Sequence, residues 1–168
     1  AGLEITEEYI DHELKRRQMG HGRGGRMKIE KDHAEIWCGV RHGKTLASPI
    51  GILVKNLDWD NWTDKMSVEP VDKKIKRVTL PRPGHADLAG VHKYGFDDIR
   101  NVLERSSARE TTMRVALGTI CRKLLEDVGI NIGSRVVQIH DIKDQTKYEM
   151  NPNELNIAAD SSPVRCLD

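Results

Sequence analysis

The chain has 168 residues, which is long enough for one domain with its own core but short for two. Its 27 lysines and arginines nearly balance its 26 aspartates and glutamates, so the net charge of +1 argues against a dedicated nucleic-acid or membrane-surface protein. Aromatic residues make up only 4%, which predicts an aliphatic core, and no apolar run is long enough for a transmembrane helix.

The ends and the cysteines give two further expectations. The chain starts at Ala1 without an initiator methionine or a signal segment, so we expect it to begin inside a longer polypeptide. Cys38, Cys121 and Cys166 are odd in number and far apart, which favours a reducing compartment, the cytoplasm, over a disulfide framework.

The first elements are predicted with clear boundaries. Thr6 is typical of a helix N-cap, and Ile5 and Ile10 have the spacing of a hydrophobic staple. This helix is expected to bury Leu14, to run to about Gln18 and to end in a basic last turn before Gly20. Three strands are expected next, over 27–30, 34–40 and 50–55, and then a mobile charged excursion over 58–76.

The second half mixes helix and strand. A rigid proline-bracketed turn is predicted to lead into a short helix near residue 87, and a long helix is predicted over 108–128, with Gly129 as its C-cap. Four apolar residues give the long helix one stripe: Met113, Leu117, Ile120 and Leu124. A strand is expected over 135–142, and 143–168 is expected to be a polar, irregular tail or insertion. The sum predicts an α+β fold in one domain, 1–168.

The segment from Lys15 to Lys28 combines basic residues with glycines. It holds six basic residues, four glycines and no acidic residue. Arginines give bidentate donors for phosphate or carboxylate, and glycines let a backbone approach a ligand closely. This favours a negatively charged small molecule, although a solvated helix end and an RNA-binding arginine–glycine box remain open alternatives.

Two other chemistries are excluded by spacing. Three residues separate Gly39 from Gly43, whereas a Walker phosphate loop needs four, and a strand pattern follows instead of a helix. The histidines and cysteines form neither an HExxH nor a CxxC motif, so no metal site is expected.

Two motifs point to an anionic ligand. His85 stands on a stiff turn between Pro83 and Asp87, where an imidazole can shuttle a proton or hold an anion, or simply brace the turn with Asp87. Ser107 and Glu110 fit a capping box at the start of the long helix, flanked by Arg105 and Arg109. Helix N-termini bind anions, but a capping box is also a common structural device.

Together these strings resemble the chorismate synthase family. The matching segments are RRQMGHGRGGRM at 16–27, GVRHGKT at 39–45, RPGHAD at 82–87 and RNVLERSSARETT at 100–112. The likeness covers roughly residues 1–142. It implies a lyase of the shikimate pathway, which converts 5-enolpyruvylshikimate 3-phosphate to chorismate by 1,4-anti elimination and needs reduced FMN. It also implies part of a β-α-β sandwich in a homotetramer, with no nucleic-acid or membrane partner.

The resemblance also assigns roles. It makes His85 the catalytic residue that protonates or stabilises the reduced flavin. The flavin contacts implied are Arg105, Ser106 and Ser107, and the substrate or NADPH contacts are Arg17, Arg23 and, in the same anionic pocket, Arg109.

The family's opening histidine segment and its C-terminal half are missing from this sequence. We therefore expect a partial domain that is inactive in isolation and binds FMN weakly. Two alternatives remain open at this point: an RNA-binding module built on the glycine–arginine loop, and a truncated, non-catalytic assembly partner.

Overall fold

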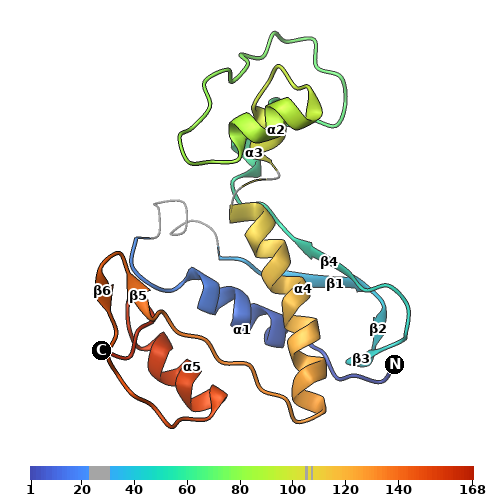
Figure 1. Cartoon of the computed structure of the whole chain (residues 1–168). Coiled ribbons are helices and arrows are strands. Elements are labelled where there is room, and N and C mark those ends of the chain that lie inside the picture. Colours follow the sequence, from blue (N-terminus) through green and yellow to red (C-terminus); the bar gives the residue numbers. More distant parts are fainter. Residues whose placement is uncertain (23–30, 105, 107) are drawn as a thin grey trace. The chain divides into compact units, whose positions relative to one another are not determined.

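The computed structural model describes residues 1–22, 31–104, 106 and 108–168, and these form two compact units (Figure 1). One unit combines 1–55 with 115–168, and the other is the segment 56–114. The first contains α1 (Glu7–Gln18), β1 (Ala34–Cys38), β2 (Val40–Arg41), β3 (Lys44–Thr45), β4 (Gly51–Val54), most of α4 (Ala108–Asp127), β5 (Gln138–Ile139), β6 (Ile142–Lys143) and α5 (Pro152–Asp160).

Helix α1 forms as its sequence predicts. The Thr6 hydroxyl accepts a hydrogen bond from the backbone N–H of Tyr9 at 3.2 Å, which caps the first turn. The staple residues Ile5 and Ile10 are buried together with Leu14, so one face of the helix packs into the core.

The sheets are small and antiparallel. Ala34 of β1 pairs with Val54 of β4, and the register shifts between Ile36 and Cys38. Acidic side chains of α1 accept hydrogen bonds from the backbone of β1. Asp11 accepts from the N–H of Ala34 at 2.8 Å, and Glu7 accepts from the N–H of Ile36 at 2.7 Å. The single strand expected over 34–40 is therefore two, because Gly39 takes a φ of 84° and a hairpin of β2 and β3 begins after it. The strand expected over 27–30 lies outside the described residues.

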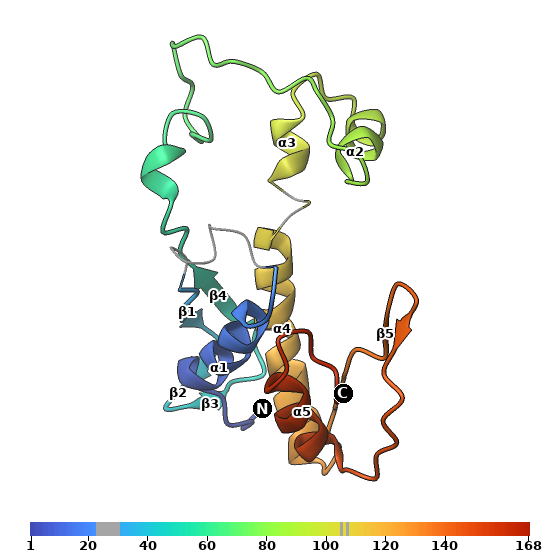
Figure 2. The same cartoon turned by 90° about the vertical axis from the view of Figure 1, so that its left-hand side faces the viewer.

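Helix α1 lies beside α4 and α5 (Figure 2), and ion pairs connect it to both helices. Glu13 accepts from Arg16 at 2.6 Å and from Arg122 of α4 at 3.1 Å. Arg16 also donates to Asp160 of α5 at 2.6 Å. The hydroxyl of Tyr9 donates to Glu126 at 2.7 Å, and burial together with this bond raises the pKa of Tyr9.

The apolar stripe of α4 does not become its buried face. Ala116 and Thr119 are buried, whereas Leu117 is 53% and Leu124 54% exposed. The reason is the bonding just described, since Arg122 and Glu126 turn the face that carries Ala116 and Thr119 toward α1. The predicted length is nearly right, as the helix ends at Asp127.

The C-terminal segment is more regular than its sequence suggests. The strand expected over 135–142 is wrong, because the chain reverses at His140 and Asp141 to form the β5–β6 hairpin. The irregular structure expected after Lys143 is also wrong. Asn151 and Glu154 form a complete capping box that starts α5, and Leu155 and Ala159 of this helix are buried.

The second unit is short of regular structure. Its elements are the 3-10 turn η2 (Trp59–Asn61), α2 (Asp87–Tyr94), α3 (Arg100–Leu103) and the first turns of α4. Helix α2 packs closely on α3 at Gly90, where an added Cβ would lie 2.3 Å from Cγ1 of Val102. This contact packs the middle of α2 directly against α3.

Candidate active site

The turn that leads into α2 is built on a buried carboxylate. Asp87, the first residue of α2, is only 1% exposed. Arg82 donates three hydrogen bonds to it: the backbone N–H at 2.9 Å and Nε at 3.0 Å to Oδ2, and Nη2 at 3.0 Å to Oδ1. Gly84 takes a φ of 68°, which lets the chain fold back between the two partners.

His85 is held by this ion pair. Its Nδ1 lies 2.9 Å from Oδ1 of Asp87 and 3.0 Å from Nη2 of Arg82. The side chain is 28% exposed, and no atom in the described part of the chain bonds to Nε2. The turn therefore anchors one ring nitrogen and leaves the other for a ligand. The histidine braces the turn through Asp87, whereas its expected role in proton transfer or anion binding stays a prediction.

Asp87 and Arg82 stabilise each other's charged forms. Hydrogen bonds from Arg82 hold the pKa of Asp87 far below its usual range, and the same side-chain contact raises the pKa of Arg82. The pair therefore stays ionised, and its two charges cancel.

Ser106 and Arg109 belong to the same unit as His85. The hydroxyl of Ser106 donates to the carbonyl of Val102 at 2.7 Å, which ties it to the end of α3. Arg109 is half-buried in the first turn of α4. Glu110 of the expected capping box pairs with Arg114 at 2.9 Å, while its partner Ser107 and the neighbouring Arg105 lie outside the described residues.

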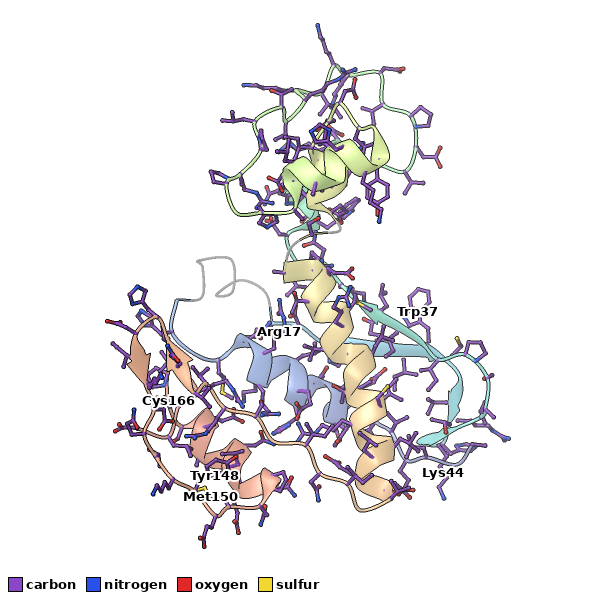
Figure 3. All side chains as sticks on the ribbon, in the orientation of Figure 1. Arg17, Trp37, Lys44, Tyr148, Met150 and Cys166 are labelled. Atoms are coloured by element: carbon purple, nitrogen blue, oxygen red, sulfur yellow. The ribbon has the colours of Figure 1, made fainter. Side chains whose placement is uncertain are left out.

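Arg17 belongs to the other unit. It lies at the C-terminal end of α1 (Figure 3), and its Nη1 donates to Oδ2 of Asp32 at 3.1 Å. Both side chains are nearly buried, at 11% and 3% exposure. The guanidinium is therefore fixed in place, and its charge is paired with that of Asp32. Arg23, its companion in the basic segment, lies outside the described residues.

A model of the chorismate synthase family matches residues 1–168. The chain belongs to the chorismate synthase family. This confirms the family recognised from the four sequence segments, and the match extends through residues 143–168, beyond the likeness seen in the sequence.

Relatives and a solved structure agree with this assignment. The chain is 52% identical to the chorismate synthase of Listeria innocua serovar 6a and 54% identical to that of Enterococcus faecalis, over 100% of its own length and 44% of theirs. A crystal structure of chorismate synthase matches with a TM-score of 0.70 at 37% identity, covering 100% of this chain and 42% of that one. The expected α+β fold class is confirmed, and the chain spans less than half the length of these chorismate synthases.

Two residues of the site were missed by sequence reasoning. Arg82 was read only as part of the RPGHAD motif, and Asp87 only as a possible brace, because burial of a carboxylate is not visible in a sequence. A signal was nevertheless present. An aspartate that opens a helix two residues after a histidine is well placed to bond the ring.

The described residues contain neither a membrane-spanning helix nor a cluster of metal ligands. Their helices include none that is long and apolar enough to cross a membrane. Their histidine, cysteine, aspartate and glutamate side chains form no group of three suited to a metal ion.

Proposed function

We propose that this chain supplies part of the active site of a chorismate synthase, which eliminates phosphate from 5-enolpyruvylshikimate 3-phosphate by 1,4-anti elimination with reduced FMN. The observation that supports this most directly is His85, fixed at Nδ1 on the buried carboxylate of Asp87 with Nε2 left for a ligand, within a chain that matches the family throughout. The reaction belongs to the shikimate pathway, which leads to the aromatic amino acids.

The donors of the second unit suit an anionic flavin. Ser106 is anchored by Val102, and Arg109 brings a half-buried positive charge to the first turn of α4. With Arg105 and Ser107, these residues would hold reduced FMN. When bound, that cofactor supplies an electron-rich ring to a reaction without net redox change. Beside it, His85 would give or take a proton at Nε2.

The arginines of the basic segment would bind the substrate. Asp32 fixes the position of the Arg17 guanidinium, so its N–H donors would be preorganised for a phosphate or carboxylate. Arg23 would join it, and in a member that reduces its own flavin both would contact NADPH. Fixed positive charge of this kind stabilises a departing phosphate.

We further propose that the protein works as a homotetramer on a phosphorylated small molecule. Its three cysteines are free, which suits the reducing cytoplasm.

Flavin binding tests the cofactor assignment. In a chimera that carries these 168 residues in place of the matching segment of the Listeria innocua relative, reduced FMN should bind, and Ser107→Ala or Arg105→Ala should weaken binding at least about tenfold. Ser67→Ala, which removes an exposed hydroxyl of the same unit, is the matched control. Unchanged flavin affinity in both site variants would remove these residues from the cofactor site.

The isolated chain gives a second test. We expect it to bind FMN weakly and to show no elimination of phosphate. Turnover by the 168 residues alone would contradict the proposal that they form only part of the site.

A further inference from the structure

We propose that Asp87 is a positioning residue that fixes the tautomer of His85, so that Nδ1 keeps its proton and Nε2 is the atom that gains and releases one. The catalytic meaning of this inference rests on the proposed function, but the tautomer itself is a property of this chain.

Three polar atoms compete at one point of the turn. Nδ1 of His85, Oδ1 of Asp87 and Nη2 of Arg82 lie at mutual distances of 2.9, 3.0 and 3.0 Å. Nδ1 can donate to the carboxylate or accept from the guanidinium, but a single tautomer cannot do both. The two alternatives place the remaining ring proton on opposite sides of the imidazole.

Hydrogen-bond satisfaction of the buried carboxylate decides between them. Oδ2 of Asp87 accepts from the backbone N–H and Nε of Arg82, and Oδ1 accepts from Nη2. A carboxylate has about four acceptor positions, so one remains, on Oδ1. If Nδ1 carries a proton, it fills that position. If Nδ1 is unprotonated, its lone pair faces the lone pair of Oδ1, and the two repel each other. The fourth acceptor position of the Asp87 carboxylate, which is only 1% exposed, then has no donor.

Arg82 favours the same outcome. Its guanidinium already donates to both oxygens of Asp87, so it gains little from a further bond to a neutral ring nitrogen. A hydrogen bond from Nδ1–H to an ionised carboxylate is charge-assisted, and the low pKa of Asp87 keeps that carboxylate ionised. Nε2 is therefore an acceptor in the neutral ring and a donor in the imidazolium, on the side that has no bond to the described residues.

Nitrogen NMR of the 168-residue chain measures the tautomer directly. The ring signals of His85 are assigned by their loss in His85→Asn. We expect the Nδ1–H form to exceed the Nε2–H form about tenfold or more in the neutral ring. In Asp87→Asn the preference should fall at least about fivefold or reverse, because the charged acceptor is gone. Asp97→Asn, which breaks the exposed pair with Arg77 in the same unit, should leave the ratio unchanged.

The result that would overturn the inference is a mainly Nε2–H ring in the unmodified chain, or an unaltered ratio in a folded Asp87→Asn variant. The first measurement is made on the unmodified chain, and His85→Asn serves only to assign its signals, so it decides even where Asp87→Asn fails to fold. In the chimera, Asp87→Asn should lower kcat at least about 100-fold with little change in KM. Full turnover in His85→Ala would contradict the proposed catalytic role of His85 but would not affect the measured tautomer.

Discussion

Buried carboxylates in this protein are bonded by backbone N–H groups and arginines. Asp144 repeats the pattern of Asp87: its oxygens accept from the backbone of Leu167 at 2.9 Å and of Thr146 at 2.9 Å, and from Arg135 at 2.7 Å. The two backbone bonds are the main reason that the pKa of Asp144 falls from 3.8 to about 2. Asp144 does not stand out in the sequence, because its partners Arg135 and Leu167 are far from it along the chain.

Asp144 should make folding sensitive to acid. Because its pKa is lowered by folding, its contribution to stability is complete above the unfolded value of 3.8 and is lost as the pH falls toward about 2. Urea unfolding of the chain and of Asp144→Asn should therefore show a difference in midpoint at about pH 6 that shrinks steadily below about pH 4. Exposed Asp72→Asn should show no such difference. A gap between the chain and Asp144→Asn that is the same at both pH values would contradict this role.

Gly90 should tolerate no side chain. Because Val102 is stiff at χ1, the 2.3 Å approach of an added Cβ cannot be relieved cheaply, and Gly90→Ala should destabilise the chain by about 1–3 kcal/mol. Gly118→Ala is the matched control. It lies in α4 with nothing within 4 Å of its Cβ, so it should stabilise by about 0.5–1 kcal/mol. The unfolding free energies in urea give both values, and equal effects at the two glycines would rule out the close packing of α2 on α3.

At the scale of elements, a helix could be predicted from the sequence when the residues that set its ends and its buried face lie close together in the chain. Helix α1 was predicted at both ends, because the cap Thr6, the staple and Gly20 all lie within one stretch. Helix α4 was predicted in length but not in orientation, because its buried face is set by bonds to Tyr9 and Glu13, more than 100 residues away. Helix α5 was missed although its capping box is local, since it is short and its surroundings are polar.

Leu14 of α1 and Leu117 of α4 test which face of each helix is packed. Leu14 is fully buried, so Leu14→Ala should cost about 2–5 kcal/mol of unfolding free energy. Leu117 is 53% exposed, so Leu117→Ala should change stability by less than about 0.5 kcal/mol. A large loss at Leu117 in urea unfolding would show instead that the apolar stripe of α4 is its packed face.

At the scale of the whole molecule, the family and the α+β class were accessible from the sequence, because the four matching segments keep both residues and spacing. The candidate site could be predicted from the sequence only in part. His85 was placed on a stiff turn, but the burial of its anchor Asp87 and the ion pair that Asp87 makes with the half-exposed Arg82 were not visible in the sequence. The chain also spans only 44% of the Listeria innocua relative.

The most direct test of this account is phosphate release from 5-enolpyruvylshikimate 3-phosphate by the chimera supplied with reduced FMN. His85→Ala should lower kcat at least about 100-fold while the fold is retained. His12→Ala, which removes a histidine on the exposed side of α1, should leave turnover unchanged. Loss of turnover in His85→Ala alone is the result that the account predicts, and equal turnover in the two variants would contradict it.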